Sequence, residues 1–228
     1  MSNIVIIGGT SGIGRELGEY YAGHGHSVVV TGRDAERAEE IAAEIGGTVR
    51  GIAVDLADPP GIAGALAGVG PVDRLALVGI QRDRNSVKDY DVGGAVDLVT
   101  MKLVGYTTVV HALLDRLTPE SSVLLFGGMA KDRPYPGSTN ISIVNAGVLG
   151  MVRTLAAEVA PVRINAIHPG VVGDSPYWAG AADLLEGVRV QTPSGRLVTM
   201  GEVVEASVML LENRGLNKVN LTIDGGFA

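Results

Sequence analysis

The feature that most constrains the fold is a regular alternation of short apolar runs with longer segments of helical periodicity. The strand-length runs are 4–7, 27–31, 49–54, 74–78, 122–126, 162–167 and 219–223, and the helical segments are 12–22, 35–45, a long one within 87–117, 141–160 and 202–212. Apolar runs without strict polar alternation are typical of strands that are buried on both faces. Strands that alternate with helices predict a parallel sheet covered on both sides. We therefore predict a doubly wound α/β fold of about seven strands.

The length of 228 residues is enough for one sizeable hydrophobic core. Because no linker, repeat or low-complexity tract interrupts the pattern, we predict a single domain over residues 1–228. The segment 174–192 is rich in Gly, Ala, Pro and aromatic residues. We predict that this segment is a mobile insertion that forms a lid over a substrate site.

Charge and composition exclude several functions. The formal net charge of -7 argues against a nucleic-acid or anionic-membrane partner. The absence of cysteine excludes disulfides, thiolate nucleophiles and zinc-thiolate sites, and the four histidines lack ligand spacing, so we predict no metal site. No apolar run approaches ~18 residues, and no basic segment opens the chain. We predict a cytoplasmic protein that acts on a small-molecule substrate.

The first predicted strand ends directly in a glycine-rich turn, and a predicted helix follows it. Glycines 8, 12 and 14 form a G-x-x-x-G-x-G pattern. Such a turn lets the backbone approach a pyrophosphate and aims a helix N-terminus at its charge. A merely tight βα turn is the alternative, but the strand–turn–helix context favours phosphate binding. The candidate cofactor contacts in this loop are Gly8, Thr10, Ser11, Gly12, Ile13 and Gly14.

The end of the second predicted strand bears on the choice between NAD(H) and NADP(H). This strand ends in Gly32-Arg33, and the guanidinium of Arg33 can bind a 2′-phosphate bidentately. An ordinary surface arginine is the alternative. Asp34 lies beyond the strand, where it fits the cap of the next helix. We predict NADP(H) in preference to NAD(H), with Asp55 as an acceptor for the adenine amino group or, alternatively, as a helix cap.

With these motifs, the chain resembles the short-chain dehydrogenase/reductase family over nearly its whole length. The segments that carry the resemblance are 8–14, 31–33, 54–56, 155–161, 163–170, 195–198 and 223–226. The resemblance implies a Rossmann-type domain, nicotinamide dinucleotide binding and, commonly, a tetramer. Because the Pro-Gly turn after the sixth strand lies along the nicotinamide face in this family, it also implies cofactor contacts at Pro169 and Gly170, to which we add Leu56 and Val172.

The family's usual catalytic residues are absent from the matching positions. The family uses a Tyr-x-x-x-Lys pair on the fifth helix, a serine before it and an asparagine on the fourth helix. The matching positions carry Ile141, Asn145, Gly128 and Lys102, and the six tyrosines offer no substitute Tyr-x-x-x-Lys pair. The resemblance therefore implies an atypical member of the family.

Lys102 and Asn145 look like a reciprocal exchange, because the family has Asn and Lys at these two positions. An ammonium that enters from the opposite wall could protonate an oxyanion or hold it electrostatically, and burial would lower its pKa. A surface lysine without a catalytic role is the alternative for Lys102. We name Lys102 and Asn145 as the candidate catalytic residues.

Three functions remain open from the sequence. The leading hypothesis is an NADP(H)-binding oxidoreductase that acts on a small organic carbonyl or alcohol. The alternatives are a catalytically inactive dinucleotide-binding sensor or assembly subunit, and a non-redox isomerase or cyclase that uses the same pocket. Apolar residues on more than one face of the fourth and fifth helices, among them Val99, Leu103, Val148 and Met151, predict a homodimer or homotetramer.

Overall fold

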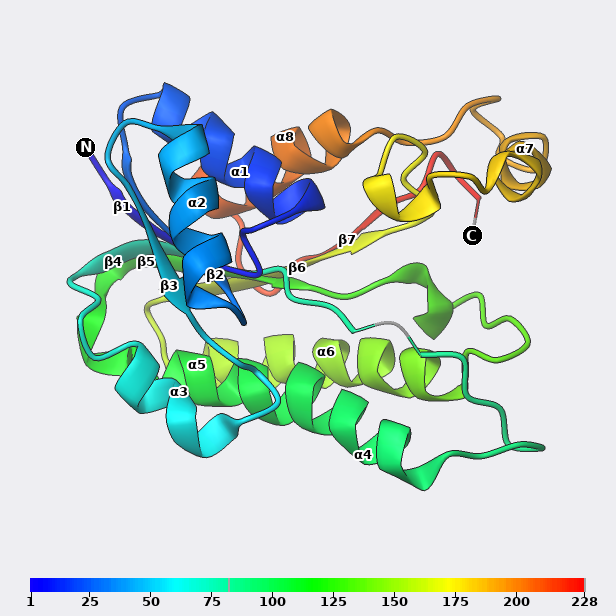
Figure 1. The fold of residues 1–228 in the computed structure, drawn as a ribbon, viewed down its shortest axis with the longest axis horizontal. Helices are drawn as coiled ribbons and strands as arrows, with labels where there is room; N and C mark the ends of the chain where they lie inside the picture. Colours follow the sequence, from blue (N-terminus) through cyan, green and yellow to red (C-terminus); the bar gives the residue numbers. More distant parts are fainter. Residues whose placement is uncertain (82, 228) are drawn as a thin grey trace.

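Seven parallel strands form one sheet in the computed structural model, which describes residues 1–81 and 83–227 (Figure 1). The strands are β1 (Asn3–Ile7), β2 (Ser27–Gly32), β3 (Val49–Ala53), β4 (Val72–Leu77), β5 (Leu117–Phe126), β6 (Arg163–Pro169) and β7 (Asn220–Ile223). Their order is β3-β2-β1-β4-β5-β6-β7, so the winding direction reverses between β1 and β4. The predicted doubly wound fold is confirmed, and ligands of such sheets bind at the carboxyl ends near this reversal.

Helices cover both faces of the sheet (Figure 1). One layer contains α1 (Gly12–Gly23), α2 (Ala35–Ile45) and α8 (Met200–Glu212), and the other contains α3 (Pro59–Ala65), α4 (Val92–Val99), α5 (Tyr106–Ala112) and α6 (Thr139–Glu158). Each layer has its own apolar core against the sheet. Leu17 of α1 and Leu211 of α8 are buried in one core, and Val109 of α5 and Val148 of α6 are buried in the other.

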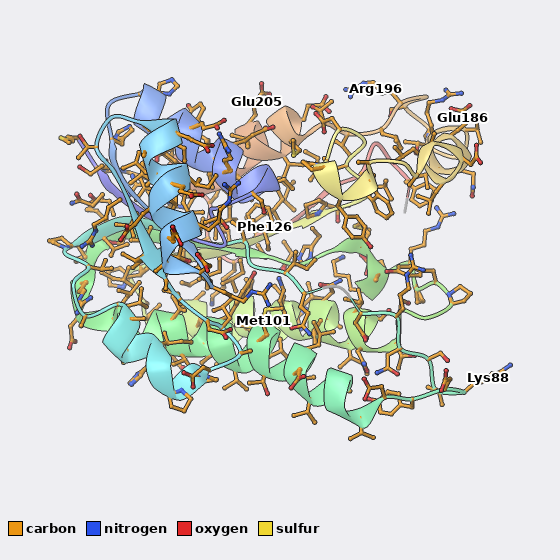
Figure 2. The ribbon with its side chains drawn as sticks, viewed as in Figure 1. Lys88, Met101, Phe126, Glu186, Arg196 and Glu205 are labelled. Atoms are coloured by element: carbon orange, nitrogen blue, oxygen red, sulfur yellow. The ribbon has the colours of Figure 1, made fainter. Side chains whose placement is uncertain are left out.

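The long helix expected within 87–117 is present as one continuous run over residues 92–112, which changes from α to π geometry and back. Between α4 and α5 lies a π-helical segment, Thr100–Gly105, and a 3-10 turn, Leu114–Arg116, follows α5. Figure 2 shows Met101 of the π-helical segment in the interior, where it packs in the core of the lower layer. A π-helical turn rotates the following side chains relative to an uninterrupted α-helix, and such turns are frequent at functional sites.

The predicted lid contains regular structure. Residues 174–192 hold a 3-10 turn, Pro176–Trp178, and the helix α7 (Ala182–Arg189). The side chains of Tyr177 and Trp178 form an edge-to-face pair with ring centroids 4.6 Å apart. Neither α7 nor α3 was expected from the sequence pattern. The α3 sequence begins with two prolines and contains two glycines, which have low helix propensity. The mobility of the lid stays a prediction.

Helix α6 is long and apolar enough to span a membrane by length and composition alone. The same properties are typical of a central helix that packs on a sheet. In the structure α6 packs on β5 and β6, and Val144, Val148 and Val152 are fully enclosed in the core. The expectation that the protein has no membrane partner stays a prediction.

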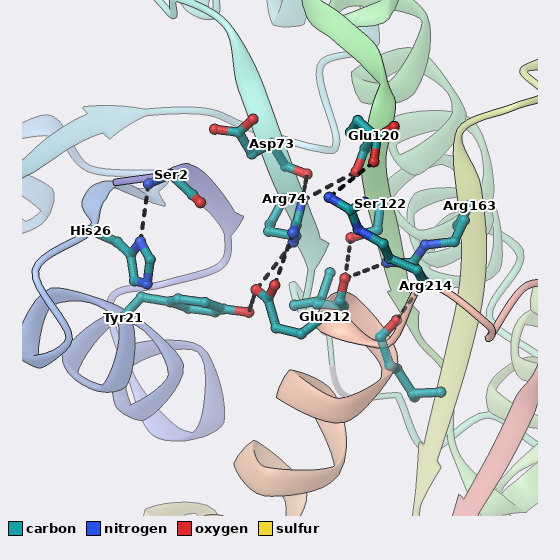
Figure 3. A network of polar contacts seen from close by, with 12 residues as sticks. Ser2, Tyr21, His26, Asp73, Arg74, Glu120, Ser122, Arg163, Glu212 and Arg214 are labelled. Atoms are coloured by element: carbon teal, nitrogen blue, oxygen red, sulfur yellow. Dashed lines mark hydrogen bonds and ion pairs between the residues drawn. The ribbon is translucent and has the colours of Figure 1, made fainter.

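A polar network at the amino ends of the strands joins α1, β4 and α8 (Figure 3). Glu212 at the end of α8 accepts a hydrogen bond from Tyr21 Oη at 3.0 Å and pairs with Arg74 Nη2 at 2.8 Å. Burial raises the pKa of Glu212, but the hydrogen bond and charge of Arg74 and the hydrogen bond from Tyr21 outweigh burial, so the pKa lies below its usual value. The ionised carboxylate therefore stabilises the folded chain.

We expect Glu212→Gln to lower the free energy of unfolding by about 1 kcal/mol at neutral pH, because the amide keeps the shape and loses the charge. A group with a depressed folded pKa stabilises above its unfolded pKa, near 4.5, and loses that effect as the pH falls through the folded pKa. The difference between the two proteins should therefore shrink in acid. Urea titrations from pH 3 to 7, with Glu205→Gln on the same helix as control, measure it. A constant difference across this range would contradict the ionic contribution.

Candidate functional site

The carboxyl ends of β1, β2, β4, β5 and β6 meet at one edge of the sheet, because all of these strands are parallel. The loops that leave this edge carry nearly all of the candidate site residues, and the lid lies beside it (Figure 1). Two further candidates, Lys102 and Asn145, come from the helical layer that contains α4, α5 and α6. The sequence-predicted residues therefore gather at one side of the molecule.

The glycine-rich turn forms an open cradle at the start of α1. Gly12 has φ +51, a conformation that favours glycine, and no atom lies within 4 Å of the place where its Cβ would be. A Cβ on Gly14 would overlap the carbonyl oxygen of Gly8. The N-cap Ser11 is extended and makes no capping hydrogen bond through its side chain, so its hydroxyl remains available. The open space and the helix N-terminus fit the pyrophosphate of a dinucleotide.

Strand β2 fixes the position of this loop. The amide of Gly8 donates to Thr31 Oγ1 at 3.2 Å, and the amide of Gly9 donates to the carbonyl of Thr31 at 2.9 Å. Thr10 packs against Gly32, where a Cβ would come within 2.8 Å of the Thr10 methyl group. Ile13 points into the adjoining core. The sequence analysis did not single out Thr31 as a site residue, although it lies in the Thr-Gly-Arg motif.

Arg33 is the exposed cation at the end of β2, and it has no hydrogen-bond or ion-pair partner in the described part of the chain. Asp34 is the N-cap of α2, since its Oδ1 accepts from the amide of Arg37 at 2.8 Å, as predicted. Arg15, in the first turn of α1, is instead paired with Glu19 and Glu44. Arg33 is therefore the side chain here that is free to meet a phosphate.

Asp55 and Leu56 differ in what they offer a ligand. Asp55 is exposed and accepts from the amide of Ala57 at 2.9 Å, so it closes a turn with one of its oxygens. Leu56 is buried and packs against Gly79, where a Cβ would lie 2.7 Å from Leu56 Cδ1. A Cβ on Gly105 of the π-helical segment would overlap the Leu56 carbonyl oxygen. In this structure Leu56 fills space between β4 and the π-helical segment.

The Pro-Gly turn after β6 borders the C-terminal segment. The amide of Gly170 donates to the carbonyl of Ile223 at 2.9 Å, and a Cβ on Gly170 would lie 2.7 Å from Asp224 Cβ. Pro169 is half-buried at the end of β6, and Val172 is buried where it forms a bridge with Val198. Gly170 is therefore a point of close contact between the chain's last strand and the candidate nicotinamide side of the site.

Lys102 is buried, with 2% of its surface exposed. Its Nζ donates to Tyr106 Oη at 2.8 Å and to the carbonyl of Gly79 at 3.3 Å, and it lies 4.4 Å from the centroid of the Tyr106 ring. The Tyr106 hydroxyl donates to the same Gly79 carbonyl at 2.8 Å, and burial raises the pKa of Tyr106 well above its usual value. The surface position that the alternative assumed for Lys102 is therefore wrong, and its catalytic role stays a prediction.

Lys102 and Tyr106 form a tyrosine–lysine pair at the helical spacing that the family's motif also uses. A Lys-x-x-x-Tyr pair, Lys102 and Tyr106, runs in the reverse order along the helical segments opposite α6. Four residues of helical spacing bring the two side chains together in either order. The pair is visible in the sequence, but its order is opposite to that of the family's Tyr-x-x-x-Lys motif.

Asn145 faces the glycines that follow β5. A Cβ on Gly128 would lie 2.9 Å from Asn145 Nδ2, and a Cβ on Gly127 would overlap the His168 ring. His168 is fully buried, and its Nε2 lies 3.1 Å from Asn220 Oδ1. Burial lowers the pKa of His168 to about 4, so the ring is neutral near pH 7. The space above the two glycines is thus filled by an amide and a neutral imidazole.

Known proteins resemble this chain in sequence and in fold. A family profile described as enoyl-(acyl carrier protein) reductase matches residues 8–228. The chain belongs to the short-chain dehydrogenase/reductase family. It is 30% identical over 224 residues to the 3-oxoacyl-(acyl-carrier-protein) reductase FabG of Aquifex aeolicus, covering 90% of this chain and 88% of that protein. It is 29% identical over 231 residues to carbonyl reductase family member 4 of Danio rerio, covering 97% and 96%.

A solved structure of a short-chain dehydrogenase/reductase family protein superposes on this chain with a TM-score of 0.89. The sequences are 29% identical, and the match covers 99% of this chain and 96% of the other. The Rossmann-type architecture that the family resemblance implied is therefore present over essentially the whole chain.

Proposed function

We propose that this member of the short-chain dehydrogenase/reductase family is an NADP(H)-dependent oxidoreductase that acts on a small organic carbonyl or alcohol through an atypical site. The observation that carries the proposal is the open glycine cradle at the N-terminus of α1, with the unpaired Arg33 beside it at the end of β2. The relatives include proteins named as carbonyl and 3-oxoacyl reductases, which supports a carbonyl substrate.

The bound cofactor supplies or accepts the hydride. The protein contributes the binding surfaces: the backbone of residues 8–14 holds the pyrophosphate, and Arg33 holds the 2′-phosphate. Asp55 keeps one oxygen for the adenine amino group, because its hydrogen bond to Ala57 uses the other. The turn at Pro169 and Gly170, with Val172 behind it, borders the nicotinamide end.

Lys102 and Asn145 carry the polar chemistry of this proposal. Ile141 has neither a proton nor a hydrogen bond to give, so the substrate oxygen needs another group as hydride arrives. The buried Lys102 ammonium stabilises that developing negative charge, and fixed charges are most effective where water is excluded. Asn145, beside Gly128 on the facing wall, contributes an amide that can orient the substrate oxygen or a water.

One observation favours a second candidate function. The Lys102 ammonium already donates to Tyr106 and to the Gly79 carbonyl, so part of its bonding capacity holds the end of β4 in place. A lysine used in this way fits a dinucleotide-binding sensor or assembly subunit that does not turn over substrate. Consumption of NADPH separates the two functions.

We expect the protein to bind NADPH at least about tenfold more tightly than NADH, a difference of about 1.4 kcal/mol. Arg33→Asp should reverse this order, because a carboxylate repels the 2′-phosphate and accepts from a free 2′-hydroxyl. Calorimetric or fluorescence titration of both dinucleotides measures the effect, with Arg37→Asp on α2 as control. Tighter binding of NADH by the parent protein would refute the role of Arg33.

We expect Lys102→Met to lower the turnover of a carbonyl substrate by about 10²–10³-fold, the usual cost of removing a group that stabilises an oxyanion. Methionine keeps most of the side-chain length and removes the charge. The assay follows NADPH absorbance over a panel of aldehydes and ketones, and NADPH affinity is titrated separately. Tyr135→Phe, on an exposed side chain, is the control. Undiminished turnover in Lys102→Met would remove this residue from the mechanism.

We also propose that the protein is a homodimer or homotetramer that meets a symmetry mate through α4 and α6. Among the apolar residues from which this contact face was predicted, Val148 is buried in the core and is unavailable to a partner. Other apolar side chains are more than half exposed: Val92 and Val96 on α4, and Ile143 on α6.

Light scattering at micromolar concentration should therefore show a dimer or tetramer. Val96→Glu with Ile143→Glu should shift it toward the monomer, since like charges would face each other across a two-fold axis. Leu184→Glu on the lid helix, where another exposed apolar side chain lies, serves as the control. A monomeric parent protein would refute the assembly.

A further inference from the structure

After β7 the chain runs beside the segment that carries α7 (Figure 1). We call residues 224–227 the C-terminal strap. The strap begins against the Pro-Gly turn, where the amide of Gly170 bonds to the carbonyl of Ile223 and Asp224 Cβ occupies the space beside Gly170. It therefore starts at the turn that borders the nicotinamide end of the proposed site.

The middle of the strap packs on the end of the lid. Gly225 has φ +71, which lets the chain turn sharply here. Its carbonyl accepts from the amide of Ser194 at 3.2 Å. A Cβ on Gly225 would lie 2.6 Å from Ser194 Oγ and 2.7 Å from Thr192 Cγ2, so the two segments are in direct contact.

The end of the strap is held by the loop that follows β5. The guanidinium of Arg133 lies over the Phe227 ring, 3.7 Å from its centroid, and Arg133 Nη1 donates to the Phe227 carbonyl. Arg133 lies on the loop that follows β5 and includes Gly128, the glycine that faces Asn145. The strap thus connects the Pro-Gly turn and the lid on one side to the β5 loop on the other.

We propose that this strap is the outer wall of the substrate cleft and that Phe227, held by Arg133, limits the length of the carbonyl compound accepted. The inference rests on the proposed function. A substrate whose oxygen reaches the region of Asn145 and Gly128 lies between the Pro-Gly turn and the β5 loop. The strap contacts both of these segments and so closes the cleft on its outer side. The aromatic ring there stops a longer apolar chain and leaves room for a short one.

The test compares straight-chain methyl ketones of increasing length as substrates, with NADPH as reductant. Phe227→Ala removes the ring, and Arg133→Met removes the group that holds it. Both variants should raise the ratio of kcat/KM for the longest to the shortest ketone by at least about tenfold, mainly through KM, since pocket size discriminates by such factors. Arg214→Met, at the opposite edge of the sheet, is the matched control and should keep the parent ratio. The NADPH affinity and the Tm of each variant show whether it folds. If one variant does not fold, the ketone ratio is judged on the other variant alone.

The outcomes separate this inference from the function on which it rests. An unchanged ratio in the folded variants, with turnover in the parent protein, overturns the wall and leaves the proposed function standing. A parent protein that reduces none of the ketones, together with a variant that reduces the longer ones, supports the wall. If neither parent nor variants reduce any ketone, the proposed carbonyl reductase function and the wall fail together.

Discussion

The close approach of backbones at the carboxyl ends of β1 and β4 is the constraint on which the site depends. The amide of Gly79 donates to the carbonyl of Ile7 at 3.0 Å, and a Cβ on Gly8 would lie 2.6 Å from the Gly79 nitrogen. Gly79 in turn packs on Leu56, whose carbonyl touches Gly105. The turn that forms the phosphate cradle and the π-helical segment that carries Lys102 are therefore parts of one packed junction.

The buried lysine is the costly part of this junction. Taking an ammonium out of water costs several kcal/mol unless hydrogen bonds replace its hydration. Here the Gly79 carbonyl and the Tyr106 hydroxyl accept from Lys102, and these two hydrogen bonds replace part of its hydration. The π-helical segment contributes to this arrangement, because it directs the Lys102 side chain toward Gly79 and Tyr106.

Local patterns in the sequence predict much of this fold. Helix α2 runs over the residues expected, because Asp34 caps its start and Gly46 follows its end. The phosphate cradle follows from glycines next to one another in the chain. The burial of Lys102 could not be predicted, because it depends on the π-helical turn and on Gly79, which lies 23 positions earlier. The contact of Arg133 with Phe227 spans 94 positions and leaves no local signal.

The interlocking of Gly128 with Asn145 has a consequence for how such a site changes over evolutionary time. A Cβ at position 128 would require the Asn145 amide to shift, and a smaller residue at position 145 alone would leave an unfilled space beside a bare glycine. The lysine usual in the family at position 145 is longer than asparagine, so the effect of a serine at position 128 depends on which residue stands at position 145. A change at one of these two positions therefore alters what the other tolerates, and this coupling comes from packing whether or not the chemistry of the site is under selection.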